Sequence, residues 1–191
     1  MTALVASTVT LLALAGAATS PAASPVPTPI GRGAPFHPPA TGPAVRDGRP
    51  VAGLVCRARE TARIGIHLEV FAHGRVLIVP AGIGIAPPVS RRGPYVLSGR
   101  CSYAARTREP TGVIERSQEH PLTLGAFFRV WGQPLGPRQV AGFRGLVRLY
   151  VNGRRLGVDP RLVPLRRHDQ IVLQVGPYVP PHVSYRFRKG L

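Results

Sequence analysis

Alternating polar residues in two strand-like stretches are the side chains of this chain best placed to do chemistry. Arg63, Gly65 and His67 alternate in one stretch, and Arg106 and Arg108 alternate in a second. Side chains two residues apart share one face of a strand, so the two sets form adjoining rows if their strands are near neighbours. Guanidinium groups bind carboxylates and phosphates, so these rows indicate an ion-pair cluster or an anion site.

Two carboxylates lie close enough in the sequence to balance these arginines. Guanidinium groups that face one pocket repel one another by about 1 kcal/mol or more per close pair at intermediate dielectric. The first hypothesis is an internal, structural ion-pair cluster of Arg63, Arg106, Arg108, Glu109 and Glu115. A second hypothesis is that the cluster binds an external anion such as phosphate, sulfate or a carboxylated glycan. A third is that the arginines extend into solvent.

The sequence contains no complete catalytic motif, which argues against an enzyme. The chain has no G-x-S-x-G elbow, Walker loop or H-E-x-x-H helix, and its eight acidic residues leave few candidates for paired carboxylate chemistry. The stretch Gly82-Ile83-Gly84-Ile85 precedes no expected helix, which argues against a phosphate-binding loop. We expect a non-catalytic protein.

An apolar run at the start of the chain indicates export. The run from Ala3 to Ala18 is too short and too rich in alanine for a membrane span, and it contains a small-x-small cleavage pattern at Ala15-Gly16-Ala17. No lysine or arginine precedes the run, which leaves a single anchor or a misplaced start as alternatives. We expect residues 1–18 to be a signal peptide, the mature protein to lie in the cell envelope or to be secreted, and no membrane span after cleavage.

Composition divides the rest of the chain into a tether and one domain. Residues 19–50 are dominated by proline, alanine, glycine and threonine, and they bury too little apolar surface to offset the entropy of ordering them. We expect them to form a disordered linker. Residues 51–191 are a normal length for one globular domain.

The only two cysteines, Cys56 and Cys101, predict a disulfide if the protein is exported to an oxidising compartment. Closing this loop stabilises a fold by about 4 kcal/mol in the chain-entropy model. A thiolate metal site is the alternative, but it needs further ligands at close spacing that the sequence does not offer.

The formal net charge of +17 points to anionic partners. All but one of the 25 basic residues are arginines, spread over the whole domain, and no series of aromatic residues lies between them to stack bases. These features and the expected export argue against nucleic acid. Small anions or anionic envelope polymers are the expected partners. The sequence does not indicate an oligomeric state.

Hydrophobic periodicity predicts three hairpins and a final strand. Residues 64–71 alternate as a half-buried strand and turn at 72–75 into 76–79. Residues 147–151 and 154–158 repeat this pattern around Asn152-Gly153, which is consistent with an old duplication. The third hairpin joins 101–107 to 112–117, and a strand follows at 171–175.

One helix is expected between the hairpins. Thr123 is an N-cap residue, Leu124 to Trp131 carry apolar side chains at helical spacing, and Gly132 ends the pattern. The aromatic face of this helix should pack on the sheet. The alternative is that these aromatic side chains form a ligand-binding box. The expected fold class is therefore α+β, mostly β: a single domain of antiparallel hairpins with one principal helix packed on the sheet.

Several segments, taken in order, resemble a functionally uncharacterised family of small exported prokaryotic proteins. They are Cys56, His67-Leu68-Glu69-Val70-Phe71, Val79 to Ile85, Cys101, Thr111-Gly112-Val113-Ile114, Leu122 to Leu135, Tyr150-Val151-Asn152-Gly153, Asp159-Pro160-Arg161 and His168. The resemblance covers nearly everything after the linker and includes the pattern T-L-G-x-F-F-x-V-W-G-Q-P-L. Family members carry H-x-H-x-H-L, L-H-T-H-D and V-I-H-[IV]-E. This histidine density implies a copper or zinc site in the family.

This chain departs from the family pattern at the expected ligands. The family histidines fall on Arg63, Gly65, His67, Arg106, Arg108 and Glu115, so only His67 is kept among them. His168 is kept in a late segment, and Glu109 stands where the family has aspartate.

The departures predict a degenerate metal site. Arginine has no lone pair to give and stays protonated, so it removes a ligand and repels a cation. We therefore expect no cofactor. The alternative is residual copper or zinc binding by His67, His168 and one carboxylate. His182 lies beside Pro180 and Pro181, where we expect exposure and no role.

Overall fold

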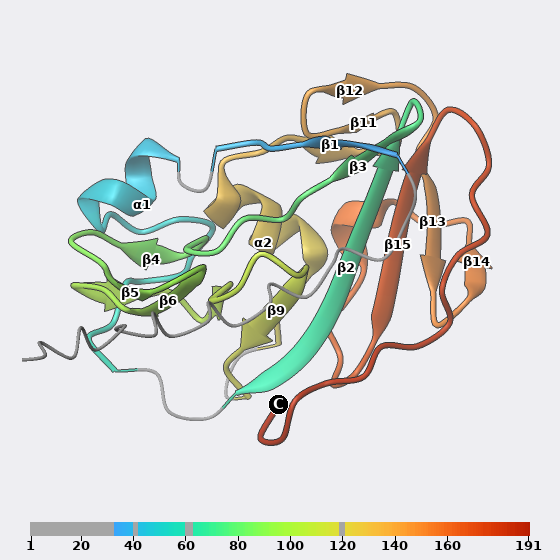
Figure 1. The fold of residues 1–191 in the computed structure, drawn as a ribbon. Coiled ribbons are helices and arrows are strands. Elements are labelled where there is room, and N and C mark those ends of the chain that lie inside the picture. Colours follow the sequence, from blue (N-terminus) through green and yellow to red (C-terminus); the bar gives the residue numbers. More distant parts are fainter. Residues whose placement is uncertain (1–32, 40–41, 60–62, 119–120) are drawn as a thin grey trace, which may run out of the picture.

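Strands dominate the structure, which is a computed structural model that describes residues 33–39, 42–59, 63–118 and 121–191 (Figure 1). The main helix is α2 (Leu124–Trp131). The prediction of a single-domain α+β fold that is mostly β is confirmed. The expected signal peptide and residues 19–32 of the expected linker lie outside the described residues. Within those residues, no helix is long and apolar enough to cross a membrane.

The largest sheet has the strand order β1-β3-β2-β15-β13-β14, and β9 and β8 extend it from one end of β2. Its strands are β1 (Ala34–Phe36), β2 (Ile64–Ala72), β3 (Arg75–Leu77), β8 (Ala105–Arg106), β9 (Val113–Arg116), β13 (Arg148–Val151), β14 (Arg154–Leu156) and β15 (Gln170–Val175). The three predicted hairpins are the antiparallel pairs β2–β3, β8–β9 and β13–β14.

Two pairings in this sheet are parallel, which the expectation of antiparallel hairpins did not include. β15 runs parallel to β2, and β1 runs parallel to β3. Parallel neighbours need a long connection between them, so they join segments that are far apart in the sequence and leave no turn signal between the strands. The pairing of β15 with β2 places the predicted last strand in the centre of the sheet.

Helix α2 packs on one face of this sheet, as its apolar spacing predicts. The Thr123 hydroxyl accepts a hydrogen bond from the Ala126 amide at 3.3 Å, and Gly132 ends the helix in the left-handed conformation at φ 77°. Phe127, Phe128 and Trp131 are fully buried in the main core. These aromatic side chains therefore pack in the core, and they do not form a ligand-binding box.

Smaller sheets and short helices complete the fold. They are β4 (Ile85–Ala86) with β7 (Cys101–Ser102), β5 (Ser90–Arg92) with β6 (Tyr95–Ser98), and β10 (Leu135–Gly136), β11 (Gln139–Val140) and β12 (Phe143–Arg144), with the 3-10 helix η1 (Pro160–Leu162). Cys56 and Cys101 form the predicted disulfide, with 5.4 Å between their Cα atoms. The disulfide ties the segment before β2 to β7.

Ordered structure begins before the predicted boundary at residue 51. Strand β1 pairs with β3, and Phe36 packs edge-on against Phe143 with 4.9 Å between the ring centroids. Helix α1 (Pro43–Asp47) buries Val45 in the main core. The linker prediction is wrong for this part of the chain because a few apolar residues pack on the domain although the local composition is poor in them.

Residues 177–191, called here the C-terminal strap, contain no helix or strand but cover the face of the sheet opposite α2. The chain end lies beside the start of β2 and the end of β9 (Figure 1). All nine residues of β2 are buried: Ile66, Leu68 and Val70 lie in the main core, while His67 stacks on Tyr185 of the strap. The expectation of a half-buried strand is therefore wrong, because the strap covers the second face.

Candidate anion-binding site

The strand pairings bring the predicted arginine rows to one carboxylate. Glu115 on β9 lies opposite Gly65 on β2 and opposite Arg106 on β8. Residues directly opposite each other on paired strands present their side chains to the same face. The two rows are thus separated by one strand, and that strand carries the counterion.

Glu115 is contacted by four guanidinium groups. Its Oε2 accepts hydrogen bonds from Arg63 Nη1 at 3.3 Å and from Arg108 Nε at 3.1 Å, and it lies 3.5 Å from Arg106 Nε. Its Oε1 accepts a hydrogen bond from Arg188 Nη2 at 2.6 Å. Hydrogen bonds between two ionised groups are the strong ones in proteins, so Glu115 fixes the positions of Arg63, Arg108 and Arg188, and it forms an ion pair with Arg106.

The cluster has a buried layer and an exposed layer. The side chains of Glu115 and Arg106 are 1% and 0% exposed, whereas those of Arg63 and Arg188 are 41% and 43% exposed. Arg106 also donates to the Tyr103 carbonyl at 3.3 Å. Arg106 and Glu115 thus form the structural base of the cluster, and Arg63 and Arg188 turn toward solvent.

Glu109 stands at the edge of the cluster. Its Oε2 lies 3.9 Å from Arg188 Nη1. Burial raises the pKa of the Glu109 carboxyl, Arg188 opposes this shift, and the nearby Glu115 carboxylate adds to it. The structure thus places all five predicted cluster residues together, but Glu109 contacts them through Arg188.

Arg188 is the residue that sequence reasoning missed. It lies 73 residues from Glu115 in a stretch whose prolines predict irregular structure. The alternation of aromatic and basic residues in Tyr185-Arg186-Phe187-Arg188 is the signal that could have found it. Alternation indicates an extended segment with one face packed, even where no strand forms.

An open groove lies over the exposed layer of the cluster, with a volume of about 540 Å³. It is lined by Arg63, Tyr95, Val96, Leu97, Arg108, Arg188 and Lys189. None of these lining residues is acidic, and the carboxylates of Glu109 and Glu115 are buried. The groove therefore presents cationic side chains whose counterions lie beneath the surface.

The strap is seated by ring stacking, which positions Arg188. Tyr185 stacks on His67 with 3.8 Å between the ring centroids, and Phe187 stacks on His168 at 4.6 Å. A Cβ on Gly65 would meet Phe187 Cδ1 at 2.7 Å, so only glycine allows this close approach. The missing side chain at position 65 therefore lets the strap bring Arg188 to Glu115.

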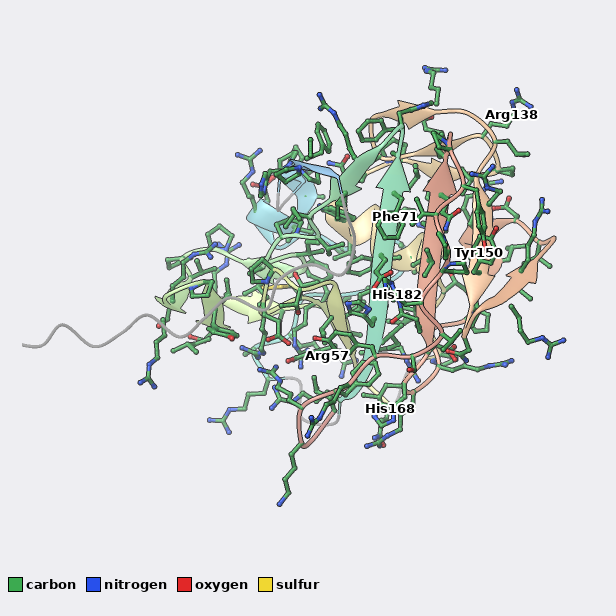
Figure 2. All side chains as sticks on the ribbon, turned by 45° about the vertical axis from the view of Figure 1, so that its right-hand side comes forward. Arg57, Phe71, Arg138, Tyr150, His168 and His182 are labelled. Carbon is green, nitrogen blue, oxygen red and sulfur yellow. A yellow bond between two sulfur atoms is a disulfide. The ribbon has the colours of Figure 1, made fainter. Side chains whose placement is uncertain are left out.

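His182 and Glu69 form a second polar contact under the strap. His182 Nδ1 lies 2.9 Å from Glu69 Oε2, and burial raises the pKa of the Glu69 carboxyl while His182 lowers it. Figure 2 shows His182 over the middle of β2 and β15, and His168 near the lower end of these strands. The expectation that His182 has no role is wrong, because a carboxylate buried in β2 needs a partner.

His67, the family histidine kept on β2, is fully engaged by the protein. Its Nε2 lies 2.7 Å from the Thr111 carbonyl and its Nδ1 lies 2.7 Å from Oε1 of the Gln170 side chain. A carbonyl only accepts, so Nε2 carries the proton. Burial lowers the pKa of His67, while its two hydrogen bonds oppose that shift. A neutral ring with its proton on Nε2 has no proton on Nδ1 to donate to Gln170 Oε1, so the hydrogen bond that such a ring donates is the one to Thr111.

The residues present do not fit the copper or zinc site that the family resemblance implies. His168 Nε2 lies 2.7 Å from the Leu191 carbonyl, so it carries a proton there, as Nε2 of His67 does toward Thr111. A protonated nitrogen has no lone pair for a metal. Across the described part of the chain, no three His, Cys, Asp or Glu side chains are grouped to hold a metal ion.

The lowered pKa of His67 predicts a pH-dependent stability. The unfolded chain takes up a proton on His67 near pH 6.5, whereas the folded chain takes it up only at lower pH. The stability that His67 contributes is therefore fully present above pH 6.5 and is lost as the pH falls through the folded pKa. We expect His67→Gln to flatten the decrease in the free energy of unfolding between pH 7.5 and 5.5. Urea denaturation at several pH values measures this decrease. The control is His37→Gln, a change at an exposed histidine. An unchanged slope in His67→Gln would contradict the assignment.

Comparison with known proteins identifies no family for this chain. No protein-family model, curated protein or solved structure matches the chain. The resemblance to the histidine-rich exported family stays a prediction, and function must be argued from the arginine cluster and the groove above it.

Proposed function

We propose that this protein is a non-catalytic, extracytoplasmic protein that binds an anionic ligand in the groove over the arginine cluster. The observation that carries the proposal is the charge of the groove. Arg63, Arg108, Arg188 and Lys189 line it, and the carboxylates that pair with the arginines lie buried. A ligand with carboxylate or phosphate oxygens matches this lining.

The arginines are pre-positioned for such a ligand. Arg108 donates from Nε to Glu115 and from Nη1 to the carbonyls of Val96 and Leu97. Arg63 and Arg188 each donate one hydrogen bond to Glu115 and are partly exposed. Side chains that are already fixed lose little entropy when a ligand binds.

Electrostatic repulsion within the groove also favours an anion. Two like charges about 4 Å apart repel by roughly 4 kcal/mol at an effective dielectric constant of 20, and solvent screening reduces this at the exposed layer. One buried carboxylate serves several guanidinium groups at once. An external anion reduces the repulsion that Glu115 leaves.

Extracytoplasmic location is supported by the disulfide between Cys56 and Cys101, since such bonds persist in oxidising compartments. The apolar run at residues 3–18 supports the same location. The non-catalytic part of the proposal rests on the sequence, which contains no catalytic motif.

A purely structural ion-pair cluster is the second candidate function, and the complete burial of Arg106 beside Glu115 favours it. In that case the cluster stabilises the fold and the groove binds nothing. The two candidates differ in what they predict for Arg63 and Arg188, which are exposed enough to meet a ligand.

Isothermal titration calorimetry of the full chain with phosphate, sulfate and citrate tests the proposal. We expect Arg63→Gln and Arg188→Gln each to weaken binding about tenfold or more, since each removes a charge-assisted hydrogen bond. Arg155→Gln, an exposed change on β14 with the same loss of charge, is the control and should change affinity little.

Equal weakening by all three variants would mean that only net charge matters, which contradicts a site in the groove. Absence of binding by the unmodified chain would favour the structural cluster. Thermal unfolding of each variant shows whether it is folded.

A further inference from the structure

We propose that the ligand is an extended acidic polysaccharide whose carboxylates repeat along a path through two connected depressions. This inference rests on the proposed function and names its ligand class. A second depression of about 250 Å³ adjoins the groove. It is lined by Ala58, Arg59, Ile85, Ser98, Gly99, Ser102 and Arg108.

Arg108 belongs to both depressions and marks the boundary between them. Its hydrogen bonds to Glu115 and to the carbonyls of Val96 and Leu97 hold it in place at that boundary. Arg59 lies in the second depression, and Arg63 and Arg188 lie in the groove. Cationic groups therefore follow one another along the path, as a chain with repeating anionic groups requires.

Strand β6 contributes residues to both depressions. Tyr95, Val96 and Leu97 line the groove, and the next residue, Ser98, lines the second depression. The strand advances about 10 Å over these four residues, since each step rises 3.2–3.4 Å. Successive side chains of a strand point to opposite faces, so the connection between the depressions rests on Arg108, which lines both. A ligand that passes over Arg108 reaches both sets of cations, whereas one small anion reaches a single set.

The remaining lining residues fit sugar rings. Ser98 and Ser102 offer hydroxyl groups that match sugar hydroxyls, and Tyr95 combines an apolar ring with a polar oxygen. Leu97, which is half exposed, adds apolar surface on which the carbon face of a sugar can rest. A polyphosphate chain has no such face and would leave this surface unused.

Single-stranded nucleic acid fits the lining less well than an acidic polysaccharide. Sequence-tolerant binding of single strands relies on aromatic side chains that stack on successive bases. Among the described residues that line the two depressions, Tyr95 is the only aromatic one. The balance of arginine, hydroxyl and apolar groups therefore favours a carboxylated glycan.

Chain-length dependence tests this inference. We expect the full-length protein to bind oligogalacturonates about tenfold or more tightly than galacturonic acid, because one chain engages both depressions. Arg59→Gln should remove this gain and leave the affinity for the monomer unchanged, whereas Arg63→Gln should weaken both. Arg155→Gln is the matched control, and fluorescence anisotropy or calorimetry gives the affinities.

The outcomes separate this inference from the proposed function. If monomer and oligomer bind equally, or if Arg59→Gln has no effect on the oligomer, the second depression is not part of the site and the inference fails while anion binding stands. If polyphosphate or oligothymidylate of matched charge binds more tightly, the ligand class is wrong. If no anion binds, the proposed function fails as well.

Discussion

Replacing Glu115 with glutamine should destabilise the protein by about 3–5 kcal/mol, the usual cost of removing one partner of a buried ion pair. The change keeps the side-chain volume but removes the carboxylate that Arg63, Arg106, Arg108 and Arg188 contact. Arg106 cannot turn to solvent because its side chain is completely buried. Urea denaturation measures the loss as a fall in the unfolding midpoint.

Asp47→Asn is the control for this prediction. Asp47 pairs with Arg49 at 3.2 Å, and both side chains are well exposed. Exposed ion pairs contribute about 0–1 kcal/mol, so this change should leave the midpoint nearly unaltered. A loss in Glu115→Gln as small as that in Asp47→Asn would show that Glu115 is not the counterion that holds the cluster.

The same variant reports on anion binding. Without the Glu115 carboxylate, the positive charges of the groove arginines are less compensated, so an external anion binds more favourably. A ligand that binds only the folded state stabilises that state by mass action. We expect sulfate to raise the unfolding midpoint of Glu115→Gln more than chloride does at equal ionic strength. Equal effects of the two salts would indicate screening alone.

Removing the disulfide should cost about 4 kcal/mol, since Cys56 and Cys101 close a loop of 45 residues. The double change Cys56→Ala and Cys101→Ala tests this by urea denaturation. A reducing agent should lower the unfolding midpoint of the unmodified chain and leave that of the double variant unchanged. A stability loss under about 1 kcal/mol would contradict the assigned role, given the usual range for native disulfides.

The disulfide also bears on the binding surface. It ties the segment that carries Arg59 to β7, where Ser102 lines the second depression. Without the disulfide, no covalent bond holds the segment that carries Arg59 to β7. The double variant should therefore bind the oligomeric ligand more weakly while its affinity for a small anion in the groove changes less.

Local elements of the fold could be predicted because their signals lie close together in the sequence. Thr123 and Gly132 cap α2 through contacts within one turn, and the turn at Asn152-Gly153 joins β13 to β14. The parallel pairing of β15 with β2 has no such signal, because it joins segments about a hundred residues apart. Ordering of β1 and α1 depends likewise on contacts with distant residues.

The site was only partly predictable for the same reason. Alternation predicted that Arg63, the residue just before β2, and His67 share one face, and the predicted hairpin of β8 and β9 places Arg106 directly opposite Glu115. The strap forms no strand, so its contacts come from ring stacking, from the space above Gly65 and from side-chain contacts such as the hydrogen bond from Arg188 to Glu115. Patterns in the sequence do not specify such contacts.

Nuclear magnetic resonance of the arginine side chains tests the central claim most directly. The Nε–Hε signals of the full chain are followed during titration with phosphate, with chloride at equal ionic strength as reference. Anion binding in the groove predicts saturable shifts for Arg63, Arg108 and Arg188, and little change for Arg155. Shifts that are equal across all exposed arginines, or that never saturate, would contradict a defined anion site.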